Sequence, residues 1–188
     1  MTWYVIALFV VGIVSLSNTI LCAVLFRQLG IFIMGSARGV SDGGIPVGKK
    51  LPNAVTTSLT GQRWELASLQ GEPYILLFGA TYCAECKDIM PKLSVVSDAY
   101  GVQIVTAIFG RDAELRDYVK QMQIPDPVVR ASESFARSLD VDVTPFAYAV
   151  GADGGVTMKG LANSVLRLEE MARSCQPQQV MLESPTRR

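Results

Sequence analysis

Two cysteines separated by two residues are the feature of this sequence with the clearest chemical meaning. Cys83 and Cys86 enclose Ala84 and Glu85, and an apolar run, residues 74–78, closely precedes them. A helix that begins at Cys83 would stabilise its thiolate through free N–H groups and the helix dipole, and would bring Cys86 round by one turn. The pair could then form a disulfide and exchange it with another protein through a mixed disulfide. The pattern predicts thiol–disulfide exchange.

Access divides the roles of the two cysteines. Cys83 follows Tyr82 at the expected end of a strand, whereas Cys86 lies one turn further into the helix. Because reactivity requires thiolate character together with access, we expect Cys83 to attack a partner and Cys86 to resolve the mixed disulfide.

Two other interpretations of the pair remain open at this point. A zinc or copper site uses the same spacing, but zinc needs further ligands. The chain has no histidine, and its other cysteines are Cys22 and Cys175, both distant in sequence. The second alternative is a pair of packed, unreactive cysteines. We expect no metal and no cofactor, and we expect Cys175 to pack on the last helix as a small apolar residue.

Two proline positions accompany the cysteines. Pro91 lies inside the helix expected to follow Cys83, where a proline should produce a kink. Thr144 and Pro145 directly precede a predicted strand, and their peptide bond is a candidate for the cis form. That bond would place backbone polar groups beside the cysteines, so Thr144, Pro145 and Tyr82 are the predicted substrate groove.

Three charged residues surround the pair: Glu85, Lys87 and Asp88. They are expected to line a solvated rim. Their role there is either solubility or the tuning of redox potential and partner choice.

Strand and helix patterns alternate around the pair. Strands are predicted at 54–59, 63–66, 74–78, 102–109, 146–150 and 156–159, and helices at 81–99, 112–122, 132–139 and 163–174. Asp112 is a plausible helix N-cap, with Leu115, Val119 and Met122 on the apolar face. The last helix is expected to turn Val165, Leu166, Leu168 and Met171 toward the core. This order predicts an α/β fold, a mixed central sheet with helices on both faces.

The N-terminal segment predicts a membrane anchor. Residues 3–26 carry no charge, and a helix of that length spans roughly 36 Å, enough for the hydrocarbon core and contact with membrane lipid. A cleaved signal peptide would instead have a basic start, a shorter apolar run and a small-residue cleavage site. Asn18 within the span indicates a transmembrane partner helix, although nearby Ser and Thr side chains can bond to their own helix.

Two observations conflict on the orientation of the span. Arg27 and Arg38 follow it and no charged side chain precedes it, which favours a cytoplasmic C-terminal domain. Disulfide chemistry is concentrated in exported compartments and favours the opposite side. We expect the domain to be extracytoplasmic, on the periplasmic side.

The rest of the chain divides by composition. Residues 27–50 are rich in glycine and predict a flexible tether, residues 51–175 the folded domain, and residues 176–188 a disordered tail. Lys and Arg total 17, as do Asp and Glu, so no basic surplus is available for nucleic acid. The absence of histidine excludes Ser-His and Cys-His catalysis.

The motifs together resemble a known group of proteins. The domain is similar to the thioredoxin superfamily, in its membrane-tethered TlpA/ResA branch, through Phe78, Ala80, Thr81, Cys83, Cys86, Lys87, Pro91, Thr144 and Pro145. The resemblance implies a thioredoxin-like fold, a reactive Cys83, a resolving Cys86 and a cis Pro145 that helps to dock substrate.

The architecture around the anchor resembles one type within this branch. The run from Arg27 to Gly30, the glycine-rich segment and residues 45–48 are similar to methylamine-utilisation accessory proteins of the MauD type. Such proteins are thought to help form or rearrange disulfides in an exported dehydrogenase subunit.

Several positions depart from the pattern of related families. Leu77 stands where thioredoxins have an aspartate, Ile89 where ResA-like proteins have a glutamate, and Gly79 where thioredoxins usually have tryptophan. Either Glu85 or Asp88 moves protons to the buried cysteine through water, or exchange is slow. Thr81 stands two residues before Cys83, which does not match the peroxiredoxin pattern.

The sequence therefore predicts a membrane-tethered thiol–disulfide oxidoreductase that reduces, forms or isomerises disulfides in a partner protein. The alternative is a non-catalytic interaction subunit of a membrane complex that retains the same fold.

Overall fold

The computed structural model describes residues 2–176, and residues 26–42 by their backbone alone. The chain forms two units, which divide between Val40 and Ser41. The predicted tail, residues 176–188, lies outside the described residues from position 177 onward.

The first unit consists of the helix α1 (Thr2–Asp42) up to Val40. Its residues Thr2–Leu25 have a mean hydropathy of 2.4 and are long and apolar enough to cross a membrane. Within it, the Thr19 hydroxyl donates to the Ser15 carbonyl (2.9 Å), so this side chain bonds to its own helix.

Residues 27–50, expected to be a flexible tether, form helix up to Asp42 and a hydrogen-bonded segment after it. The helix continues past Arg27 to Asp42, because no proline interrupts it before Pro46. The segment that follows is hydrogen-bonded to the domain: Gly48 N–H donates to the Val156 carbonyl (2.7 Å), and Val156 N–H donates to the Lys49 carbonyl (2.9 Å). The glycines of this segment therefore permit turns in a docked chain.

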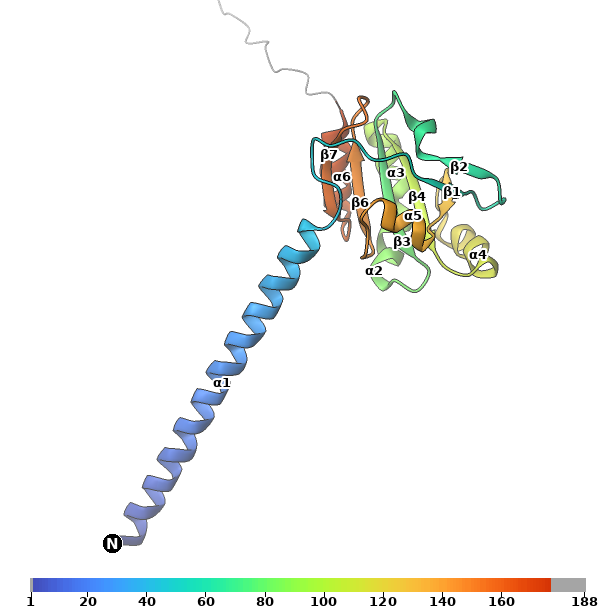
Figure 1. The fold of residues 1–188 in the computed structure, drawn as a ribbon. Coiled ribbons are helices and arrows are strands. Elements are labelled where there is room, and N and C mark those ends of the chain that lie inside the picture. Colours follow the sequence, from blue (N-terminus) through green and yellow to red (C-terminus); the bar gives the residue numbers. More distant parts are fainter. Residues whose placement is uncertain (1, 177–188) are drawn as a thin grey trace, which may run out of the picture. The chain divides into compact units, whose positions relative to one another are not determined.

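The second unit alternates strands and helices (Figure 1). Its elements are β1 (Val55–Thr57), β2 (Arg63–Glu65), η1 (Leu66–Leu69), β3 (Tyr74–Ala80), α2 (Ala84–Ile89), η2 (Met90–Lys92), α3 (Leu93–Tyr100), β4 (Gln103–Phe109), α4 (Asp112–Met122), β5 (Val128–Arg130), α5 (Glu133–Ser138), β6 (Phe146–Val150), β7 (Val156–Leu161) and α6 (Val165–Cys175).

The central sheet has five strands in the order β5-β4-β3-β6-β7. β3 lies in the middle, parallel to β4 and antiparallel to β6. β1 and β2 form a separate antiparallel hairpin. The predicted mixed sheet is confirmed, and β5 is an additional strand that the sequence analysis did not predict.

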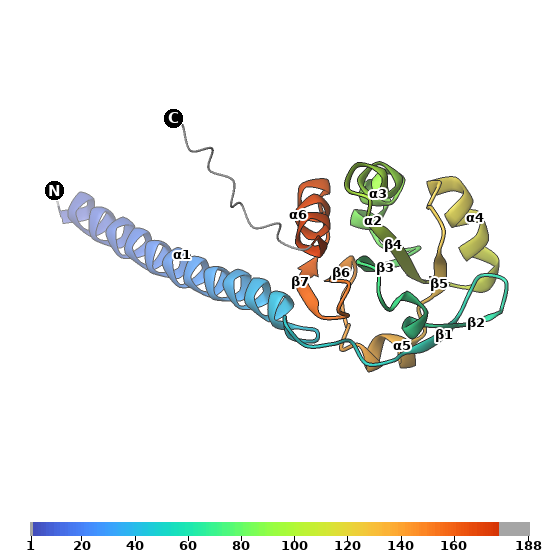
Figure 2. The same ribbon diagram turned by 90° about the horizontal axis from the view of Figure 1, so that it is seen from above.

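Two hydrophobic layers cover the two faces of the sheet. All seven residues of β3 are buried, and those from Tyr74 to Phe78 alternate between the layers because successive side chains of a strand point to opposite faces. Helices α2, α3, α4 and α6 cover one face, and α5 with the β1–β2 hairpin covers the other (Figure 2). The prediction of helices on both faces is confirmed.

The helix predicted over residues 81–99 is broken as expected at its proline. α2 ends at Ile89, the short 3-10 turn η2 contains Pro91, and α3 begins at Leu93. Proline lacks the N–H that an α-helix needs at this point, so the regular hydrogen bonding is interrupted.

Two details of the predicted helices were wrong. Arg111 is the N-cap of α4, and its side chain makes no capping hydrogen bond to the helix. Asp112 is the first helical residue, where it pairs with Arg130. In α6, Leu166 is 73% exposed. The buried face of α6 consists of Leu168, Met171, Ala172 and Cys175, whose spacing follows one side of a helix and leaves Leu166 on the other.

Candidate active site

The cysteine pair lies at the junction of the central strand and a helix, as predicted. β3 ends at Ala80, Cys83 is the N-cap of α2, and Cys83 and Cys86 form a disulfide with their Cα atoms 5.3 Å apart. The Cys86 backbone N–H points at Cys83 Sγ, 3.2 Å away. This N–H would stabilise a thiolate on Cys83 once the disulfide is reduced.

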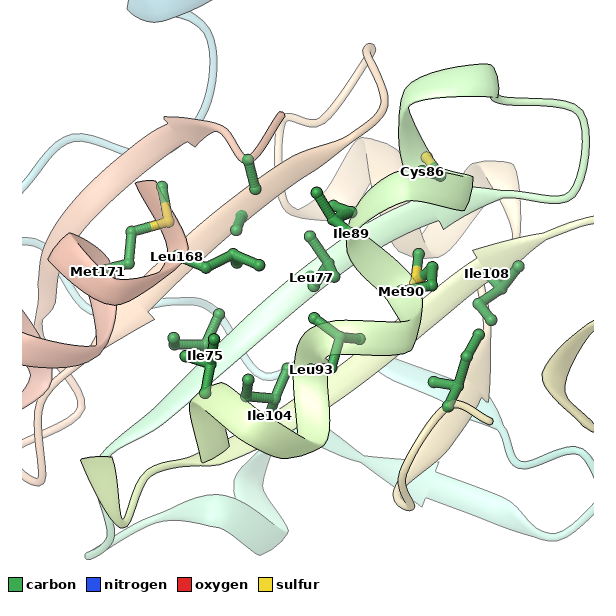
Figure 3. Close-up of a cluster of buried hydrophobic side chains, with 14 of the residues drawn as sticks. Ile75, Leu77, Cys86, Ile89, Met90, Leu93, Ile104, Ile108, Leu168 and Met171 are labelled. Carbon is green, nitrogen blue, oxygen red and sulfur yellow. The ribbon is translucent and has the colours of Figure 1, made fainter. Parts of the chain in front are cut away.

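The two sulfurs differ in burial. Cys86 is fully buried, whereas Cys83 retains 7% of its surface and follows Tyr82, which is 78% exposed. Cys86 lies at one end of the cluster of apolar side chains under α2, near Ile89 and Met90 (Figure 3). A partner can therefore reach Cys83 and not Cys86.

The packing of α2 and η2 on β3 leaves little room for a side chain at position 79. A Cβ atom there would overlap Met90 Cε and lie 3.6 Å from Cys86 Sγ. Leu77 and Ile89, which replace the acids of related families, are both buried in the same cluster as Cys86. The environment of Cys86 is consequently apolar.

A carboxylate lies close to the pair on the solvent side. Glu85 Oε2 lies 3.9 Å from Cys83 Sγ. Glu85, Lys87 and Asp88 are all exposed, which agrees with a solvated rim. A carboxylate at this distance opposes formation of a thiolate on Cys83 through like charge.

The Thr144–Pro145 peptide bond is cis, as predicted. Phe146, the next residue, pairs with Phe78 of β3 in the sheet register, so Thr144 and Pro145 lie at the end of the sheet where β3 leads into the cysteines. Thr144 and Tyr82 line one hollow of about 540 Å³, together with Asp140 and Asp142. The structure therefore brings two of the three predicted groove residues to a common cavity, which reaches the residue before Cys83.

A second hollow, of about 690 Å³, lies between Tyr82 and α4. Lys87 and Tyr118 are among its lining residues. The Tyr118 hydroxyl is buried without a hydrogen-bond partner among the described residues, and burial raises its pKa. Tyr82 therefore stands between two cavities, one on either side of it.

The residues of α5 and of the loop before β6 are the part of the site that sequence reasoning missed. Glu133, Arg137, Asp140 and Asp142 line the hollow beside Tyr82. The density of charge in residues 133–142, just before Thr144, was the available signal. A charge-rich segment is normally a solvated surface, so it did not indicate a cavity.

Cys175 lies away from the pair. It is buried, and its Sγ is 3.4 Å from the carbonyl of Tyr74, at the opposite end of β3 from Cys83. Burial raises the pKa of the Cys175 thiol to about 11. The predicted packing of Cys175 on the last helix is confirmed. Over the described part of the chain, no cluster of three or more Cys, Asp or Glu residues could hold a metal ion.

Comparisons with known proteins agree with this geometry. The profile of the AhpC/TSA family matches residues 47–159. The chain is 30% identical over 119 residues to a thiol-disulfide oxidoreductase ResA of Bacillus cereus, covering 60% of this chain and 68% of that protein. It is 22% identical over 174 residues to the methylamine utilization protein MauD of Paracoccus versutus, covering 91% and 88%.

Solved structures show the same fold. A thiol:disulfide interchange protein of the thioredoxin family from Chlorobium tepidum TLS matches with a TM-score of 0.59 at 21% identity, over 70% of this chain and 98% of that one. The thioredoxin-like architecture expected from the sequence is therefore confirmed.

Proposed function

The chain belongs to the AhpC/TSA family, and from that premise we propose that it is a membrane-tethered thiol–disulfide oxidoreductase in which Cys83 attacks and Cys86 resolves. The observation that carries this assignment is the disulfide at the β3–α2 junction, with one sulfur accessible and the other buried. Thiol–disulfide exchange requires this asymmetry, because the mixed intermediate must form at one sulfur and be released by the other.

The reaction proceeds in two exchanges when the reduced protein meets a partner disulfide. The Cys83 thiolate attacks one partner sulfur, the partner S–S bond breaks, and the second partner sulfur leaves as a thiolate that takes up a proton. Cys86 then loses its proton and attacks Cys83 Sγ, which releases the first partner sulfur. The partner gains two electrons and the Cys83–Cys86 disulfide is restored. Oxidation of a partner dithiol runs through the same steps in reverse.

The surroundings of Cys86 separate the two steps. Leu77 and Ile89 give this thiol an apolar environment, which favours its protonated form. Cys86 therefore stays neutral until the mixed disulfide has formed. Its proton then leaves through water to Glu85 or Asp88 on the exposed rim.

The substrate is a protein, held in the groove beside Cys83. The exposed Tyr82 ring and Thr144 form part of its walls, and the buried Pro145 directly follows Thr144. An extended partner segment is held there by main-chain hydrogen bonds to the Thr144 region.

The experiment that tests the function is the reduction of insulin disulfides by the full chain in detergent, with dithiothreitol as electron source. Wild-type protein should accelerate precipitation of the insulin B chain, and Cys83→Ser should not. Equal rates in the two proteins would favour the alternative, a non-catalytic interaction subunit. The absence of an acid at positions 77 and 89 is the observation that speaks for this alternative.

Localisation follows from the chemistry and from α1. The segment Thr2–Leu25 anchors the protein in the membrane, and the domain of residues 51–175 lies on the periplasmic side, where protein disulfides form and persist. Protease added to intact spheroplasts should digest the domain. Protection until lysis would place it in the cytoplasm, as Arg27 and Arg38 suggest.

A further inference from the structure

The segment that follows α1 in the chain is fixed to the catalytic domain by its own contacts. We call residues 43–50 the strap. Lys159 Nζ of β7 donates hydrogen bonds to the carbonyls of Gly43 and Gly44, each 2.7 Å long. The strap is further paired with the β7 hairpin through Gly48 and Lys49. A linker that only supplied reach would need none of these bonds.

A single buried hydroxyl joins the strap to the interior. Ile45 N–H donates to Tyr148 Oη (2.8 Å), and the Tyr148 hydroxyl donates its proton to the Leu139 carbonyl (2.6 Å). Tyr148 is fully buried in β6, and burial raises its pKa to about 12. The hydroxyl therefore keeps its proton, and both of its hydrogen bonds have a fixed direction.

Leu139 begins the loop that borders the substrate groove. This loop, residues 139–145, contributes Asp140, Asp142 and Thr144 to the hollow shared with Tyr82. Asp140 has a φ of 54°, the left-handed conformation that commonly follows the end of a helix. The start of the loop is held by the backbone hydrogen bonds that end α5 and by the bond from the Tyr148 hydroxyl to the Leu139 carbonyl.

The contact between strap and Tyr148 is tight enough to require glycine. Gly44 has a φ of 85°, and a Cβ there would overlap Tyr148 Oη and approach Phe146 Cζ to 2.8 Å. The Phe146 and Tyr148 rings pack edge to face, with centroids 5.1 Å apart. Phe146 directly follows Pro145, so the strap packs against the residue next to the Thr144–Pro145 segment.

We propose that the strap, acting through the Tyr148 hydroxyl, positions the loop of residues 139–145 for recognition of the protein substrate. Tyr148 is a positioning residue, since it touches neither sulfur. The proposal rests on the proposed function for its kinetic consequence, but the mechanical link from strap to loop can be measured without turnover. It predicts that a domain cut after the strap, at residue 51, keeps its cysteines and loses selectivity for proteins.

The test uses the full chain in detergent and the variant Tyr148→Phe, which removes one oxygen and retains the ring. The rate of exchange with insulin should fall roughly three- to tenfold, the effect of losing support from two hydrogen bonds. The rate with a small disulfide, oxidised glutathione, should stay as in the wild type, because a small molecule does not use the groove. Hydrogen exchange should rise both at Ile45 and across residues 139–144.

Two variants that loosen the strap, one in β7 and one in the strap itself, separate the link from a general defect. Lys159→Met removes the bonds to Gly43 and Gly44, and Gly44→Ala forces the strap away from Tyr148; neither alters the loop directly. Both should raise hydrogen exchange at the amides of residues 139–144. Both should also slow thiol–disulfide exchange with insulin. Tyr100→Phe is the matched control. It also removes a tyrosine hydroxyl that forms a hydrogen bond, but this hydroxyl, on α3, accepts from the exposed Arg173 of α6 and contacts neither strap nor loop. It should change none of these readouts.

The outcomes are distinct. Suppose that hydrogen exchange rises at Ile45 in Lys159→Met and Gly44→Ala, while the amides of residues 139–144 stay protected. The strap then does not position the loop, and the proposal is wrong. If Tyr148→Phe does not fold, these two variants decide the question in the same way. If the wild-type chain exchanges with neither insulin nor glutathione, the proposed function has failed, and the hydrogen-exchange result still decides whether strap and loop are linked.

Discussion

At the scale of single residues, the unequal burial of two adjacent sulfurs determines the order of the chemistry. Cys83 is an N-cap with a backbone N–H directed at its sulfur, and Cys86 is enclosed by apolar side chains. Both properties arise from one turn of helix placed on the end of a buried strand. The sequence indicated this arrangement because the spacing of the cysteines and the apolar run before them are both local patterns.

Trapping of the mixed disulfide tests the roles of the cysteines directly. Cys86→Ser should accumulate a covalent adduct between Cys83 and the partner, because the second exchange is blocked. Cys83→Ser should trap little, since the remaining sulfur is fully buried. Non-reducing gels of cell extracts measure both, and mass spectrometry of the adduct identifies the partner. Strong trapping by Cys83→Ser would reverse the assignment.

Glu85 should tune the redox potential of the pair. Its carboxylate, 3.9 Å from Cys83 Sγ, disfavours the thiolate, and thus the reduced form. Glu85→Gln should therefore raise the reduction potential by roughly 10–30 mV, about the shift that a change of up to tenfold in the exchange equilibrium produces. Equilibration with glutathione followed by alkylation measures it. Asp88→Asn is the control, and an equal shift in both variants would mean that only net charge matters.

The buried Thr106 hydroxyl should lower the free energy of unfolding. Thr106 is fully buried on β4, and its Oγ1 has no hydrogen-bond partner among the described residues. Thr106→Val keeps the shape and removes the unpaired oxygen, so the free energy of unfolding should rise by about 1–2 kcal/mol. Thr157→Val is the matched control and should lower it, because the Thr157 hydroxyl donates to the Ala149 carbonyl. A lower urea midpoint for Thr106→Val would show that its hydroxyl has a partner such as buried water.

At the scale of the elements, the active site depends on how closely α2 packs on β3. Gly79→Ala places a methyl group against Met90, whose side chain is enclosed by the core. Overpacking of this kind should lower the free energy of unfolding by about 1–3 kcal/mol and displace the Met90 side chain. Thermal unfolding measures the loss. Gly12→Ala, whose new Cβ meets no atom within 4 Å, should leave the domain unchanged.

Elements with strong periodic patterns were predictable, and those held by distant contacts were not. β3 is a continuous apolar run, β4 is apolar except for Gln103 and Thr106, and Pro91 interrupts the helix that contains it. β5 has three residues and is preceded by two prolines, so its strand character comes from pairing with β4. The strap was predicted to be a flexible tether for a similar reason: its glycines suggested mobility, and its order comes from Lys159 and Tyr148, more than 100 residues away.

At the scale of the whole molecule, the buried ionisable groups set the alkaline limit of stability. Burial raises the pKa of Cys175 from 9.0 to about 11, and those of Tyr74 and Tyr148 from 10.0 to about 12. Below about pH 9 the folded and unfolded states bind these protons equally. Between pH 9 and 12 the unfolded state ionises first, so it is favoured as the pH rises.

The free energy of unfolding should therefore be level up to about pH 9 and should fall from there to pH 12. Urea unfolding of the protein with its Cys83–Cys86 disulfide intact, at pH 8, 10 and 11, measures the fall. Cys175→Ala removes the group that titrates first, so its loss of stability between pH 9 and 11 should be smaller than that of the wild type, even though the smaller side chain lowers stability at pH 8. The two tyrosines remain, and the decline above pH 10 should persist in the variant. An identical alkaline decline in both proteins would contradict this prediction. It would mean that Cys175 ionises in the folded state as readily as in the unfolded one, despite its burial beside the Tyr74 carbonyl.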